Sequence, residues 1–137
     1  MNQEIYEDFA KLFIEETKKL KVGDPLNEET DVSSMIHPGE VDRIVKWIEE
    51  AKSQGAEVAT GGDFTDRSLS PTVLTNVTAD MNVVCEEVFA PIVSLIPYDN
   101  LDEAIGLVND SQFGLNAAIY TNVLTDAMKA ADEIEAG

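Results

Sequence analysis

Apolar residues recur at helical intervals over the first twenty positions of the chain. Within residues 2–20, acidic residues come early and lysines late, an order that complements the helix dipole. The pattern predicts an amphipathic helix whose apolar face consists of Ile5, Phe9, Leu12, Phe13 and Leu20. Gly23 and the residue before Pro25 disfavour helix, so the polar stretch 24–36 is predicted to be a loop.

A second helix is predicted over residues 38–54. Pro38 stands where the first turn of a helix accepts proline, and Gly55 is typical of the left-handed residue that ends one. One apolar stripe runs through Val41, Ile44, Val45, Ile48 and Ala51. Trp47 lies beside this stripe, and we interpret it as a packing residue.

After residue 55 the pattern changes to short segments rich in β-branched residues. We predict strands at 57–60, 70–77, 91–98 and 116–121, with Gly61 and Gly62 in a turn. Asn100, followed three residues later by Glu103, resembles a capping box and predicts a helix through about Val108. A last helix is predicted over about 124–135. Helices between the later strands favour an α/β fold, a mostly parallel sheet flanked by helices in one unit.

Composition and charge narrow the function classes. Hydrophobic residues make up 44% of the 137 residues and charged residues 26%, which is typical of a globular domain. The net charge is −18, and residues 68–137 contain eleven acidic residues and one basic residue, Lys129. Nucleic acids are therefore not expected as partners, because binding phosphate backbones takes clusters of Lys and Arg. No apolar run approaches the roughly 20 residues of a membrane span, and no signal peptide is recognised, so we expect a cytoplasmic protein.

Few residues could carry chemistry by themselves. His37 is the only histidine, so neither a histidine-rich metal site nor a Ser-His-Asp triad is expected. Because it stands next to Pro38, we interpret His37 as a loop or helix-capping residue. Cys85 is the only cysteine and rules out a disulfide within the chain. Its acidic neighbours Glu86 and Glu87 oppose formation of a thiolate, so we expect a structural thiol.

The segment Cys85-Glu86-Glu87-Val88-Phe89-Ala90-Pro91 combines two carboxylates and an aromatic residue just before a predicted strand. A carboxylate can accept two hydrogen bonds from vicinal hydroxyls such as those of a ribose. In an extended backbone the aromatic residue two positions later lies on the same side and can pack on a flat ring. From the spacing alone, a surface pair of acidic residues beside a core phenylalanine is a better interpretation than a binding site.

Several stretches in order along nearly the whole chain resemble the aldehyde dehydrogenase superfamily. They are Val22-Gly23-Asp24-Pro25, Ala51 to Gly55-Ala56, Gly61-Gly62 with Ser70-Pro71-Thr72-Val73-Leu74, Asp80-Met81, Glu86-Glu87-Val88-Phe89-Ala90-Pro91, Leu101-Asp102-Glu103-Ala104-Ile105, Asn109-Asp110-Ser111-Gln112-Phe113-Gly114-Leu115 and Ile134-Glu135-Ala136-Gly137.

The resemblance implies an enzyme that oxidises an aldehyde to a carboxylic acid with NAD or NADP, through a thiohemiacetal on a cysteine. By resemblance, Glu87 holds the nicotinamide ribose hydroxyls and Phe89 lies against the nicotinamide. No catalytic residue and no metal ligand is assigned in this chain. The substrate would be a small-molecule aldehyde, and the full-length enzyme a homodimer or homotetramer.

Two departures from the family pattern change the expectations. Ala90 stands where the usual motif has glycine, which matters if the backbone there needs a positive φ and is harmless if the position only needs to be small. Cys85 is not at the place of the family's nucleophile. We therefore expect residues 1–137 to be part of the catalytic domain, without the cofactor-binding domain and the nucleophile segment, and inactive alone. The alternative is a degenerate paralogue that acts as a non-enzymatic binding or assembly module.

Overall fold

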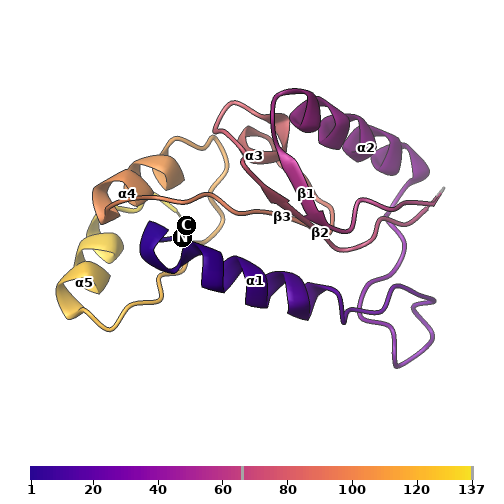
Figure 1. Ribbon diagram of the computed structural model, residues 1–137, viewed down its shortest axis with the longest axis horizontal. Coiled ribbons are helices and arrows are strands. Elements are labelled where there is room, and N and C mark those ends of the chain that lie inside the picture. The colour runs from indigo at the N-terminus through magenta and orange to yellow at the C-terminus, as the bar shows by residue number, and fades with distance from the viewer. Residues whose placement is uncertain (66, 137) are drawn as a thin grey trace. The chain divides into compact units, whose positions relative to one another are not determined.

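The chain divides into two compact units in the computed structural model, which describes residues 1–65 and 67–136 (Figure 1). The first unit joins the N-terminal residues 1–6 to the segment from Pro97 onward, and the second comprises Glu7–Ile96. Each unit is described by itself below.

The second unit contains a three-stranded sheet in the order β1-β2-β3. Its elements are α1 (Tyr6–Thr17, which starts at the last residue of the N-terminal segment), α2 (Pro38–Ser53), β1 (Glu57–Thr60), β2 (Thr72–Thr75), α3 (Asn82–Cys85) and β3 (Ile92–Ser94). Strand β2 pairs antiparallel with β1, where Glu57 lies opposite Thr75. It pairs parallel with β3, where Thr72 lies opposite Ile92. The α/β class is confirmed, and the sheet is mixed, so the expected parallel arrangement holds for one of its two pairings.

The turn after β1 explains why the first pairing is antiparallel. The two segments stay antiparallel beyond β1, because Phe64 pairs with Leu69 and the Thr65 N–H donates to the Ser68 carbonyl at 2.8 Å, so the chain reverses between Phe64 and Leu69. Gly61 and Gly62, with φ values of 78° and 82°, lie before this reversal. A Cβ on Gly61 would lie 2.2 Å from the carbonyl oxygen of Pro71, so only glycine fits this close approach. The chain therefore returns beside β1 and forms a hairpin-like pair. The parallel neighbour β3 is reached through α3 instead.

Helix α2 packs on the sheet through its apolar stripe. Val41, Ile44, Ile48 and Ala51 are buried, which confirms the predicted core face. Ile44 and Ile48 form one cluster with Met35 and Leu69, and Ala51 joins a second with Leu74 and Val83. Trp47 packs against both clusters, so its predicted packing role is confirmed.

Both ends of α2 are built as the sequence predicts. The Nδ1 atom of His37 accepts a hydrogen bond from the backbone N–H of Gly39 at 3.0 Å, so the single histidine caps the helix. Pro38 occupies the first turn, where its missing N–H costs no hydrogen bond. Gly55 follows the helix with φ 109°, in the left-handed region.

The N-terminal helix is shorter than predicted, because α1 ends at Thr17 and is preceded by a short 3-10 turn, η1 (Gln3–Ile5). Phe9 and Phe13 stack one helical turn apart, with ring centroids 5.5 Å apart. The polar stretch 24–36 is loop, as expected.

Besides η1, the described residues of the first unit form the α-helices α4 (Leu101–Asn109) and α5 (Leu124–Glu133). The Asn100 side chain accepts a hydrogen bond from the Glu103 N–H at 3.0 Å, which confirms the predicted cap. The Glu103 carboxylate in turn accepts from the Asp99 N–H at 2.8 Å. Lys129 on α5 donates a hydrogen bond to Asp102 on α4 and lies 4.0 Å from Glu133, so one cation links the two helices.

One predicted strand is wrong, and one short helix was not predicted. Residues 116–121 form no strand, and all of them are exposed. Strand propensity needs a neighbouring strand to pair with, and among the described residues none lies beside this segment. The short helix α3 was not predicted, because four residues are too few to show a helical period. None of the helices in the described part of the chain is long and apolar enough to cross a membrane.

We predict a pH effect at Lys129. The hydrogen bond to Asp102 raises the pKa of Lys129 above its usual value, and the charge of Glu133 adds to this. The folded state therefore holds this proton more tightly than the unfolded state. The stabilisation is complete below the unfolded pKa of about 10.4 and is lost as the pH rises through the folded pKa.

The matched control is Lys129→Arg, because a guanidinium stays charged over this range. From about pH 10 upward, the free energy of unfolding of the wild type should fall relative to that of the variant. Urea unfolding at each pH measures the difference. A difference independent of pH would show that the ion pair does not couple to folding.

Candidate functional site

The segment 86–91, here called the 86–91 loop, connects α3 to β3 in the second unit. Exposure alternates along it: Glu87 and Phe89 are exposed, whereas Val88 and Ala90 are half-buried. Val88 and Ala90 pack against the cluster formed by Ile44, Ile48 and their neighbours. Phe89 is 77% exposed. The loop therefore turns two small apolar side chains to the core and presents a carboxylate and an aromatic ring to solvent.

Arg43 on α2 holds the middle of this loop. Its Nη2 atom donates a hydrogen bond to the carbonyl oxygen of Val88 at 3.0 Å. Nε and Nη2 also donate to Oε2 of Glu40, at 2.9 and 2.7 Å, and the guanidinium lies 4.2 Å from the centroid of the Trp47 ring. The cation is thus fixed from two further sides by residues of its own helix.

The elements on either side of the loop are fixed as well. The side-chain amide of Asn82 in α3 donates to Oε2 of Glu50 in α2 at 3.0 Å. The hydroxyl of Ser94 in β3 donates to the carbonyl of Val83 at 3.1 Å. The N–H of Thr72 in β2 donates to the carbonyl of Pro91 at 2.8 Å. Both ends of the 86–91 loop are therefore tied to the core of the unit.

Phe89 has an unusual backbone conformation, with φ 48°. A bulky residue in the left-handed region is a true outlier, and such strain persists only where the surroundings impose it. Ala90 has no positive φ, so the possibility that this position needs glycine for its backbone is wrong. Ala90 instead packs against the core cluster, which fits a position that takes a small residue. The strain lies one position earlier, on the exposed aromatic residue.

Chemically, the loop offers an acceptor and a flat apolar surface. An exposed carboxylate such as that of Glu87 can accept hydrogen bonds from two adjacent hydroxyls. The exposed ring of Phe89 can stack on a planar heterocycle. The structure thus places both residues predicted for cofactor binding on the solvent side of one loop held by the core. Arg43 was missed, because nothing in the sequence marks a contact with a residue 45 positions away.

Cys85 is the last residue of α3 and is half-buried. Its thiol donates to the carbonyl oxygen of Asp80, with the sulfur 3.7 Å from that oxygen. A hydrogen bond from the Thr78 hydroxyl holds the pKa of the Asp80 carboxyl below its usual value, so this neighbour is an anion at neutral pH. The contact between the thiol and the Asp80 carbonyl ties Cys85 to the turn before α3. In the described ranges, no group of three or more Cys, His, Asp and Glu residues could hold a metal ion.

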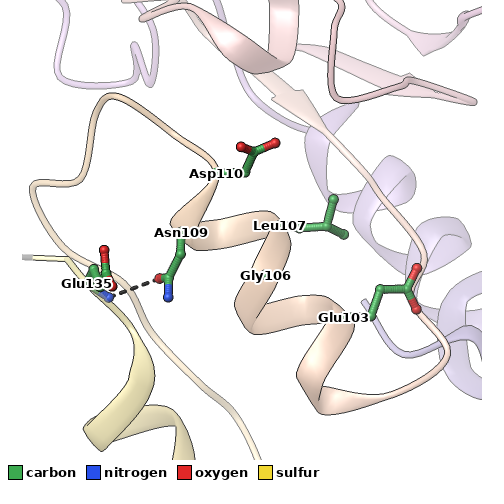
Figure 2. Close-up of a pocket in the computed structure, with 6 residues that line it drawn as sticks. All are labelled: Glu103, Gly106, Leu107, Asn109, Asp110 and Glu135. Atoms are coloured by element: carbon green, nitrogen blue, oxygen red, sulfur yellow. Dashed lines mark hydrogen bonds between the residues drawn. The ribbon is translucent and has the colours of Figure 1, made fainter.

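A separate hollow lies in the first unit, along α4 (Figure 2). It is lined by Glu103, Gly106, Leu107, Asn109, Asp110 and Glu135. The side chain of Asn109 accepts from the N–H of Glu135 at 3.0 Å and donates to the carbonyl of Glu133 at 2.7 Å, which fastens the segment after α5 to α4. Three of the lining residues are acidic, so this hollow would repel the diphosphate of a dinucleotide.

Comparison with known proteins gives consistent matches over the whole chain. Residues 1–137 match the family model described as the aldehyde dehydrogenase family. The chain is 47% identical over 133 residues to the 3-sulfolactaldehyde dehydrogenase of Priestia megaterium, covering 97% of the chain and 28% of the relative. It is 37% identical over 137 residues to the lactaldehyde dehydrogenase of Methanococcus maripaludis, covering 100% of the chain and 29% of the relative.

Solved structures give the same picture. Aldehyde dehydrogenase 21 from Physcomitrella patens, crystallised with the reaction product succinate, superposes with a TM-score of 0.95 at 32% identity, over 99% of this chain and 28% of that one. Betaine aldehyde dehydrogenase from Staphylococcus aureus in complex with NAD+ gives a TM-score of 0.91 at 31% identity, over 99% and 28%. The chain thus spans less than a third of the length of these proteins.

The strain at Phe89 leads to a test by substitution. We predict that Phe89→Gly is more stable to unfolding than Phe89→Ala by about 1 kcal/mol, because glycine adopts a positive φ without the penalty that any Cβ brings. Both variants lose the same ring, so the difference isolates the backbone. Urea unfolding of the two variants measures it. A more stable alanine variant would mean that Phe89 is not held in the left-handed region.

Proposed function

The chain belongs to the aldehyde dehydrogenase family, and we propose that it is the segment of an NAD(P)-dependent aldehyde dehydrogenase that holds the nicotinamide half of the cofactor. The enzyme oxidises an aldehyde to a carboxylic acid. The observation that carries the proposal is the conformation of the 86–91 loop, in which the core fixes Val88 and Ala90 and leaves Glu87 and Phe89 exposed. The NAD+ in the Staphylococcus aureus relative supports a nicotinamide cofactor.

Each of the two exposed side chains has its own task in this proposal. The Glu87 carboxylate accepts hydrogen bonds from the two hydroxyls of the nicotinamide ribose, and an ionised acceptor makes these bonds stronger than a neutral one would. The Phe89 ring packs against the nicotinamide and limits its rotation. A bound nicotinamide would supply the hydride acceptor for the oxidation. The chain's own contribution is to orient that ring, since hydride transfer requires one face at a fixed distance from the donor.

The covalent chemistry is assigned to residues outside this segment. Cys85 ends a short helix, and its thiol donates a hydrogen bond to the backbone carbonyl of Asp80, which is not a base that could take up the proton of a nucleophile. We propose that the nucleophilic cysteine, the general-base glutamate and the dinucleotide-binding domain belong to other parts of the enzyme. A small-molecule aldehyde as substrate and a homodimer or homotetramer as the assembly are parts of the same proposal. A cytoplasmic location stays a prediction.

We predict that Glu87→Gln in the complete enzyme raises the KM for the cofactor or slows hydride transfer. Glutamine keeps the size of the side chain and removes the charge, and a hydrogen bond to a charged group contributes roughly 1.5–3 kcal/mol, or about tenfold to a hundredfold. Steady-state kinetics with varied cofactor measures the effect. The matched control is Glu86→Gln, the exposed carboxylate next to it, which should change the cofactor KM by less than about twofold. Unchanged kinetics for Glu87→Gln would remove this residue from the site.

We also predict that residues 1–137 on their own catalyse no oxidation of aldehydes. The reaction needs an activated thiolate, and the only thiol of the segment, Cys85, is hydrogen-bonded to a backbone carbonyl, which cannot take up its proton. The test adds an aldehyde and NAD or NADP to the pure segment and follows the absorbance of the reduced nicotinamide. Steady cofactor reduction that Cys85→Ser abolishes would place the nucleophile here after all and overturn the assignment.

A further inference from the structure

We propose that Arg43 is a positioning residue for cofactor binding, which acts by holding the carbonyl of Val88 and thereby keeps Phe89 in its left-handed conformation. The inference has two parts. The effect on binding of the nicotinamide ring rests on the proposed function. The control of the Phe89 backbone by a side chain of α2 rests only on contacts within the second unit.

The geometry links the two residues through one peptide group. The carbonyl oxygen of Val88 belongs to the same planar unit as the backbone nitrogen of Phe89. The orientation of that plane is set by the ψ of Val88 and the φ of Phe89. A donor that fixes the oxygen therefore restrains φ of Phe89, and Nη2 of Arg43 does so at 3.0 Å.

The bond is suited to holding a strained backbone. Its donor is charged, and hydrogen bonds to ionised groups are roughly twice as strong as neutral ones. Only 30% of the Arg43 side chain is exposed, which limits competition from water. At 48°, φ of Phe89 lies where a residue with a Cβ does not stay unless the surroundings impose it. In the described part of the chain, the Arg43 bond is the side-chain contact made to the peptide group next to Phe89.

Arg43 is itself held in place, which a positioning role requires. Glu40 accepts two hydrogen bonds from its guanidinium, one turn away on α2. The Trp47 ring supports the flat face of the group at 4.2 Å. A planar fork can satisfy the carboxylate, the ring and the Val88 carbonyl together, whereas the point charge of a lysine cannot. Glu40 and Trp47 therefore hold Arg43 in place on α2, and Arg43 in turn holds the backbone of the 86–91 loop.

The first experiment measures structure and stability in the complete enzyme. Arg43→Met removes the donor, and the matched control Lys46→Met removes a cation of the same helix that pairs with Glu50 and does not contact the loop. Crystal structures give φ of Phe89, and thermal unfolding identifies variants that fail to fold. We expect Phe89 to leave the left-handed region in Arg43→Met and to keep it in the control. A positive φ retained in Arg43→Met overturns the proposal. If Arg43→Met does not fold, Arg43→Lys and Arg43→Gln carry the same measurement.

The second experiment is a double-mutant cycle on the cofactor KM. Arg43→Met should raise the cofactor KM on the order of tenfold and leave the aldehyde KM unchanged. The reason is that a displaced Phe89 ring no longer packs correctly against the nicotinamide. In the Phe89→Ala background the same substitution should change it little, since no ring is left to position. Equal effects in both backgrounds would mean that Arg43 contacts the cofactor directly, and would overturn the proposal.

The two experiments separate this inference from the proposed function. If Phe89→Ala alone leaves the cofactor KM unchanged, the role of Phe89 in the proposed function fails, and the positioning role in cofactor binding fails with it. The φ values still decide, independently of any cofactor, whether Arg43 controls the backbone at Phe89.

Discussion

The packing of helix α2 on the mixed sheet is the constraint on which the candidate site depends. The buried stripe of α2 fixes the helix in position, with Ile44 fully buried at its centre. Arg43 and Trp47 flank that stripe on the same helix, so the place of the guanidinium follows from the burial of its neighbours. The hydrogen bond from Arg43 to the Val88 carbonyl then fixes the 86–91 loop, which has no regular secondary structure of its own. A half-buried cation thus connects hydrophobic packing to the shape of a solvent-facing site.

The 86–91 loop shows a division between residues that secure it and residues that it presents. Val88 and Ala90 pack against the core, whereas Glu87 and Phe89 are exposed. A strained backbone lowers the stability of the fold, and an exposed aromatic ring does not offset this loss by packing in the core. Such strained positions are concentrated at functional sites. The strain therefore supports a binding role for this loop by an argument that does not use sequence resemblance.

Sequence periodicity predicted the elements that local rules determine. The α2 stripe, the His37 cap, the Gly55 terminus and the Asn100 cap all depend on residues within one or two turns of each other, and all are confirmed. The predicted strand at 116–121 failed because strands depend on a partner that the local pattern does not contain. Glu87 and Phe89 were assigned through their motif, and their role stays a prediction. The bond from Arg43 and the positive φ at Phe89 were not, because both arise from packing between segments distant in sequence.

Ala90 and Phe89 together show what the loop requires at each position. The family motif usually has glycine where this chain has Ala90, and the ordinary φ there shows that a Cβ is tolerated as long as the residue fits against the core. Glycine would be easier at position 89, where φ is positive, yet the chain has its bulkiest loop residue there. Backbone conformation alone would favour glycine at position 89 and a larger residue at position 90. The exposed, strained ring of Phe89 is thus accounted for by the proposed contact with the cofactor, and the proposed restraint from Arg43 makes its strained position tolerable.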